Sequence, residues 1–123
     1  MVKQWLLAAI VSGVVLAGPA FGHAKLLSSV PAADAQVQVA PKSLMLTFNE
    51  NVRLAVLTLT MDGKNIPVTV DRNASAAPQV SVNLPALPAG KYQVQWSALS
   101  VDDGHVSKGT FSFAIVAAAA QSR

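Results

Sequence analysis

The two histidines are the residues of this 123-residue chain whose types and positions could do chemistry. His23 follows an apolar N-terminal run, and His105 lies in the segment SVDDGHVSKG, residues 100–109. A cut after Gly22 would make His23 the first residue, and its α-amine and ring Nδ1 could then bind one metal ion in a chelate ring. Such nitrogen donors suit Cu(II), which stands at the top of the divalent affinity order and favours tetragonal sites of nitrogen and oxygen.

Asp103 places a carboxylate two residues before His105. The two side chains point the same way if a strand pattern persists through this segment, and Gly104 between them lets the backbone bend. Ordinary interpretations also exist, because Asp103-Gly104 is common turn chemistry and loop histidines are often merely exposed. His23 could likewise be an accident of where an export signal ends. Spacing alone leaves the metal site and these interpretations open.

The N-terminal segment has the layout of a secretory signal peptide. Lys3 precedes Trp5–Ala17, an uncharged and mostly apolar stretch of 13 residues, and small residues Ala20 and Gly22 lie three and one before the expected cut. A transmembrane anchor is the alternative, but a bilayer-spanning helix needs about 20 apolar residues. We therefore expect residues 1–22 to be a cleaved signal peptide and the rest of the chain to be exported.

The remaining residues fit one small domain. The chain has no cysteine, so neither disulfides nor thiolate metal ligands are available and stability must come from apolar packing. Its basic residues are scattered singly, which gives no nucleic-acid-binding patch. We expect no stable membrane insertion after signal cleavage, and a monomer is the default for so small a domain.

Alternation of apolar and polar residues dominates the rest of the sequence and predicts strands with one buried face. Asp62-Gly63 predicts a tight hairpin turn. No window has a helical period, and residues 117–123 are expected to form a flexible tail. The expected strands, which together predict an antiparallel β-sandwich or barrel, are about 25–29, 43–48, 57–61, 68–70, 80–84, 92–96 and 111–115.

Three segments resemble the CopC family of periplasmic copper-resistance and copper-handling proteins. They are HAKLLSSVPAADAQVQVAP from His23, LMLTFNENV from Leu44, and LPAGKYQVQWSALSVDDGHVSKGTFSFAI from Leu84. Together they run nearly the length of residues 23–116. The matching positions include Phe48, Glu50, Gly90, Tyr92, Trp96, Ser100, Asp103, His105, Gly109 and Phe113.

The resemblance implies an immunoglobulin-like or cupredoxin-like Greek-key fold and a site for one Cu(II) ion. Carried onto this chain, the implied ligands are His23 with its terminal amine, Asp103 and His105. Asp103 keeps the Asp-X-His spacing, whereas the neighbouring Asp102 stays an alternative, either as the ligand or as a partner that orients a ring N–H. The role of Glu50 stays open, because a solvated carboxylate at a strand end explains it equally well.

Some members of that family also carry a methionine-rich loop for Cu(I). Soft thioethers select Cu(I), but after residue 22 this chain has only Met45 and Met61, both expected to pack in or at the end of strands. The resemblance therefore leads us to expect a protein that binds Cu(II) alone.

The function expected is periplasmic binding of Cu(II), for buffering or delivery, without catalysis. Whether an inner-membrane copper transport protein receives the ion stays open. One alternative is a copper-dependent oxidative enzyme, because an N-terminal histidine with a second histidine also resembles the copper brace of lytic polysaccharide monooxygenases. Another is a metal-free domain that binds a protein along a strand edge.

Overall fold

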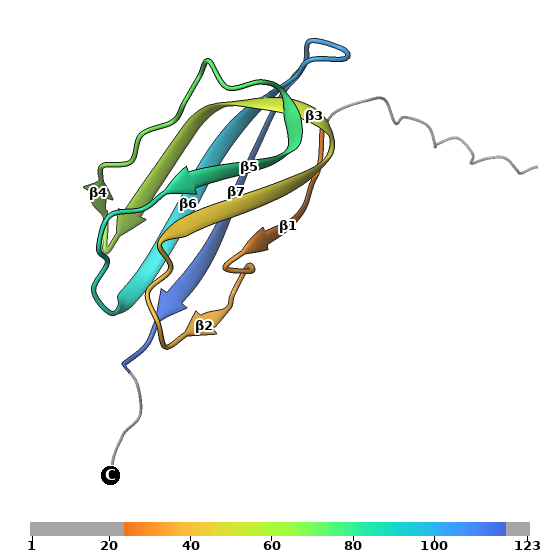
Figure 1. Cartoon of the computed structure of the whole chain (residues 1–123). Helices are drawn as coiled ribbons and strands as arrows, with labels where there is room; N and C mark the ends of the chain where they lie inside the picture. Colours follow the sequence, from red (N-terminus) through yellow and green to blue (C-terminus); the bar gives the residue numbers. More distant parts are fainter. Residues whose placement is uncertain (1–23, 118–123) are drawn as a thin grey trace, which may run out of the picture.

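The computed structural model describes residues 24–117 and folds them into strands. No helix occurs within this range, so none is available there to cross a membrane. The predicted signal peptide, His23 and residues 118–123 lie outside the described residues. The strands, drawn in Figure 1, are β1 (Leu26–Val30), β2 (Gln36–Val37), β3 (Ser43–Met61), β4 (Lys64–Ile66), β5 (Ala77–Asn83), β6 (Gly90–Ser100) and β7 (Val106–Ile115). The expectation of an all-β fold of seven strands is confirmed.

The strands form one curled sheet in which chain neighbours are often not sheet neighbours. The order is β1-β3-β6-β7-β2, and β4 and β5 also pair with β3. All pairings are antiparallel except that of β2 with β7. The first part of β3 pairs with β1 and β5 and its later part with β6 and β4, so this one strand joins the two halves of the curled sheet (Figure 1).

Strand β3 replaces two strands that the sequence predicted separately. It runs for 19 residues without interruption, whereas alternation indicated strands at 43–48 and 57–61. The polar run Asn49-Glu50-Asn51 hides the continuity, but Val52 and Leu54 resume the buried positions of the same face. Glu50 therefore lies half-buried inside a strand, so of the explanations left open for it, a solvated carboxylate at a strand end does not hold.

The Asp62-Gly63 turn is confirmed, but the strand predicted after it is displaced. Asp62 and Gly63 have φ angles of 51° and 80°, as a type I′ hairpin turn requires, and β4 pairs back on β3 directly after them. Pro67 follows β4 and has no N–H to donate to a ladder. Residues 68–70 consequently form no strand, although Val68 and Val70 still pack against the core.

The core lies between the inward faces of the strands and contains most of the aromatic residues. Phe48 and Trp96 meet edge to face with ring centroids 5.1 Å apart, and Tyr92 stacks on Phe113 at 5.3 Å. A side chain at Gly109 would come within 2.5 Å of the Trp96 ring, so glycine allows this close packing. The Tyr92 hydroxyl donates to the Pro88 carbonyl, and burial raises its pKa, with a further contribution from the nearby Asp62.

Candidate metal centre

The loop between β6 and β7 holds two of the three predicted ligands. Its ends are closed by two backbone hydrogen bonds of 2.9 Å, from the Ser100 N–H to the His105 carbonyl and from the Gly104 N–H to the Ser100 carbonyl. Gly104 adopts a φ of 75°, in the left-handed region that glycine enters without a steric penalty. The loop is therefore a defined turn that returns the chain to β7 directly after His105.

Asp103 and His105 lie together within this loop, as their spacing predicts. The His105 backbone N–H donates to Asp103 Oδ1 at 3.0 Å, and His105 Nδ1 lies 3.5 Å from Asp103 Oδ2. The side chains are 29% exposed for Asp103 and 58% exposed for His105, so an ion from solvent can reach both. An oxygen and a nitrogen donor thus face the same space at the surface.

The loop also keeps Asp103 ionised. The hydrogen bond from the His105 backbone N–H is the main cause that lowers the pKa of the Asp103 carboxyl below its ordinary value. The Ser100 hydroxyl and the positive charge of a protonated His105 act in the same direction, whereas desolvation opposes them. At neutral pH this position therefore offers a carboxylate, the form that a metal ion binds.

Ser100 links the loop to β3 and was missed as a site residue by the sequence reasoning. Its side chain is 0% exposed, and its hydroxyl donates to Glu50 Oε1 at 2.5 Å. Glu50 is half-buried in β3. The alternation of apolar and polar residues along β6 could have indicated Ser100. This alternation places Trp96, Ala98 and Ser100 on one buried face, so the Ser100 hydroxyl lies at the end of the core.

The described chain begins at this same end of the molecule. Ala24 is buried, with 4% exposed, and Lys25 exchanges two hydrogen bonds with Asn49: its N–H donates to Asn49 Oδ1 at 2.8 Å and its carbonyl accepts the Asn49 N–H at 3.1 Å. Figure 1 shows the start of the described chain and the β6–β7 loop at one end of the sheet.

Three consecutive residues of β3 bind both the start of the described chain and the segment where β6 enters the β6–β7 loop. Asn49 bonds to Lys25, Glu50 to Ser100, and the Asn51 carbonyl to the Val101 N–H at 3.2 Å. His23, the third predicted ligand, lies outside the described residues, but the residue after it is fixed at this end. Within residues 24–117, no three histidine or acidic side chains gather closely enough to hold a metal ion on their own.

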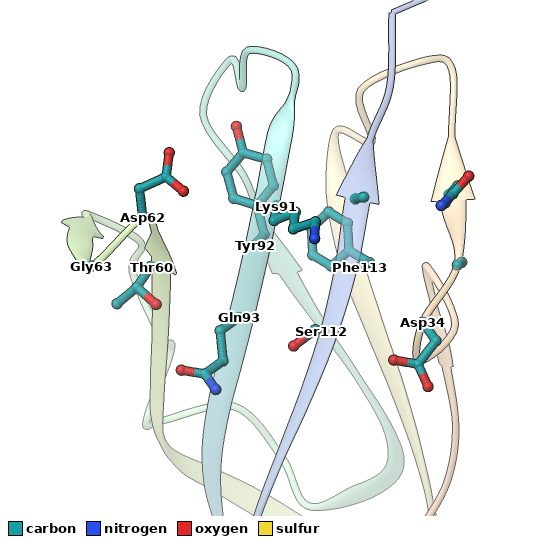
Figure 2. Close-up of a pocket in the computed structure, with 12 residues that line it drawn as sticks. Asp34, Thr60, Asp62, Gly63, Lys91, Tyr92, Gln93, Ser112 and Phe113 are labelled. Carbon is teal, nitrogen blue, oxygen red and sulfur yellow. The ribbon is translucent and has the colours of Figure 1, made fainter.

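A hollow of about 490 Å³ lies at the other end of β6. Figure 2 shows Asp62 and Asp34 on opposite sides of it, with Lys91 between them. Its floor includes Tyr92 and Phe113, which are cross-strand partners far along the ladder from Ser100. Neither Asp103 nor His105 lines it, so this hollow is separate from the candidate metal centre.

Comparison with known proteins points to one family. The family model of the CopC domain matches residues 26–116. Copper resistance protein C of Escherichia coli is 37% identical over 121 residues, which cover 87% of this chain and 94% of the relative. PcoC of Escherichia coli, described as a methionine-rich copper resistance protein, has a solved structure with a TM-score of 0.63 and 32% identity, covering 76% of this chain and 99% of that one.

A further solved structure supports the fold. CopC from Methylosinus trichosporium OB3b matches with a TM-score of 0.67 and 24% identity, covering 80% of this chain and 98% of that one. The family match spans nearly all the described residues, and the resemblance noted in the sequence rests on the same segments. The chain therefore belongs to the CopC domain family, which includes copper resistance proteins.

Proposed function

We propose that the exported, processed protein binds one Cu(II) ion in the periplasm and buffers it or delivers it to a partner. The ligands proposed are the α-amine and ring of His23, the Asp103 carboxylate and the His105 imidazole. The observation that carries the proposal is the attachment of two distant segments to one stretch of β3, at Asn49 and Glu50. That attachment puts the start of the described chain and the β6–β7 loop at the same end.

The donor set fits the ion. Imidazole and amine nitrogens with one carboxylate oxygen make up the nitrogen and oxygen set in which Cu(II) takes tetragonal geometry. The ionised Asp103 adds a negative charge that partly offsets the charge of the ion. Because the His105 backbone N–H already holds Asp103 in the same loop as the His105 ring, the two ligands are close together before the ion arrives.

The methionines support Cu(II) as the oxidation state. Met45 and Met61 both lie half-buried in β3, and Met61 packs against the core next to Gly90. Met61 is thus a packing residue, whereas Met45 lies between the buried Leu44 and Leu46 on the opposite face of β3. The described residues offer no cluster of thioethers for Cu(I).

Binding without catalysis is favoured by the surroundings of the site. A carboxylate ligand takes a coordination position that oxygen chemistry would need open. Tyr92 and Trp96, whose rings would have to be exposed to hold a polysaccharide, are buried in the core at 1% and 7% exposed. The exposure of His105 suits transfer of the ion to another protein, and an inner-membrane copper transport protein is the acceptor proposed.

Copper affinity is expected to fall as the pH is lowered from about 8 to about 6, because free α-amine and imidazole groups take up protons in this range. The pKa of Asp103 is lowered in the folded protein, so its carboxylate stays ionised throughout this window and should not contribute to the slope. The test is a Cu(II) titration of the processed protein against a competing chelator at several pH values, corrected for protonation of the chelator.

An Asp103→Asn variant is the matched control for this titration. It should bind more weakly than the native protein at every pH but show the same slope, because nitrogen protonation still sets the slope. An affinity that does not change between about pH 6 and 8 would contradict nitrogen ligation and with it the proposed function.

A further inference from the structure

Ser107 carries a hydroxyl that the fold buries without a partner. The residue is half-buried in β7, but its Oγ is closed off from solvent and has no hydrogen-bond partner among the described residues. A buried polar atom without a partner is unfavourable and rare in native proteins, so each one calls for an explanation. No other described side chain shares this condition.

Ser107 lies near the start of β7, just after the loop that carries Asp103 and His105. Ser107 is two residues after His105 and pairs across the ladder with Ala98, which is fully buried on the same face of β6 as Ser100. Further along β7, the inward positions are Gly109, against the Trp96 ring, and buried Phe111. Ser107 is therefore the last inward position of β7 before the loop, and along the chain it comes between the core positions of β7 and His105.

A ligating histidine needs an acceptor of the kind that Ser107 offers. Imidazole binds a metal through one ring nitrogen and donates its other N–H to a nearby oxygen, which fixes the ring in place. In this structure Asp103 Oδ2 lies 3.5 Å from His105 Nδ1. An Asp103 carboxylate that turns to a copper ion gives up this contact, so the remaining N–H of the His105 ring then requires another oxygen.

We propose that the Ser107 hydroxyl accepts the remaining ring N–H of His105 when copper is bound, which makes Ser107 a positioning residue of the copper site. This inference rests on the proposed function. It explains why an apolar-facing position of β7 carries a hydroxyl: the oxygen is unsatisfied before the ion binds and satisfied afterwards. Part of the free energy of copper binding then comes from the hydrogen bond that the buried Ser107 oxygen gains.

The Ser107→Ala variant of the processed protein tests the inference, because copper affinity and stability of the metal-free protein should respond differently. Cu(II) affinity should fall by roughly 10-fold, within the range for residues that orient metal ligands. The urea midpoint of the metal-free protein, followed by Trp96 fluorescence, should stay unchanged or rise, since the variant removes an unsatisfied hydroxyl. Ser112→Ala, at an exposed position on the same strand, is the matched control and should change neither quantity.

Unchanged copper affinity in Ser107→Ala, with the native protein binding copper tightly, would overturn this inference alone and leave the proposed function standing. A lower urea midpoint in the metal-free variant would also overturn it, because the hydroxyl would then serve the fold. In the His105→Ala background, Ser107→Ala should have no additional effect on affinity, whereas additive losses would contradict the proposed contact. If the native processed protein fails to bind Cu(II), the proposed function and this inference fall together.

Discussion

Adding Gly-Pro in front of His23 of the processed protein is expected to lower its Cu(II) affinity by at least about 100-fold, beyond the range for residues that only orient a ligand. The extension turns the α-amine into an amide, which no longer binds copper as a neutral amine. The chelate ring of amine and imidazole is then lost. Proline is chosen because it has no amide N–H that copper could displace to form a new chelate with the added residues.

The matched control carries the same Gly-Pro after Arg123 and should bind copper as the native protein does. Affinity is measured by competition with a chelator of known strength, on protein whose first residue has been verified by mass spectrometry. The folded core should be unaffected, because the first residue with described contacts is the buried Ala24. Equal affinity of the two extended proteins would show that the terminal amine is not a ligand.

Replacing His105 by alanine is the second change expected to have a large effect. Loss of this imidazole should also weaken Cu(II) binding by more than about 100-fold, because the variant removes a ligand rather than a residue that orients one. The free energy of unfolding of the metal-free protein should change by less than about 0.5 kcal/mol, as is usual for exposed surface positions. Chelator competition and urea unfolding measure the two quantities.

The neighbouring acids provide an internal comparison for the same assay. Asp103 bonds to the His105 backbone and lies beside its ring, whereas Asp102 is exposed and makes no such described contact. Asp103→Asn should therefore weaken copper binding strongly, and Asp102→Asn should leave it close to native. If Asp102→Asn weakened copper binding more than Asp103→Asn, the carboxylate ligand would be Asp102. If His105→Ala bound copper as tightly as the native protein, His105 would not be a ligand.

The sequence predicted those parts of the fold that rest on local patterns. Alternation marked most strands because each has one buried face, and Asp62-Gly63 marked its turn because few residue pairs accept two positive φ angles. The joining of two expected strands into β3 was missed, since polar residues around Glu50 interrupt the apolar pattern without ending the strand, although the register of the β3–β5 pairing shifts between Thr47 and Val52. The two-residue strand β2 is too short for any periodicity to show.

The part of the candidate site that could be predicted is the part that depends on residues close together in the sequence. Asp103 and His105 are two apart in one loop, so their proximity follows from local geometry. The contacts of Ser100 with Glu50 and of Lys25 with Asn49 join residues far apart in the chain, and only the sheet topology creates them. The Ser107 hydroxyl lacks a hydrogen-bond partner because of the atoms that surround it in the folded structure, and no sequence pattern predicts such an environment.

An electron paramagnetic resonance spectrum of the processed protein with one equivalent of Cu(II) tests the proposed ligand set most directly. A single tetragonal Cu(II) species is expected, whose hyperfine structure reports the terminal amine and both imidazoles. The imidazole contribution should diminish in His105→Ala, and the amine contribution should disappear on addition of Gly-Pro before His23. A native spectrum of aqueous or oxygen-only Cu(II), or one that neither change alters, would contradict the proposed site.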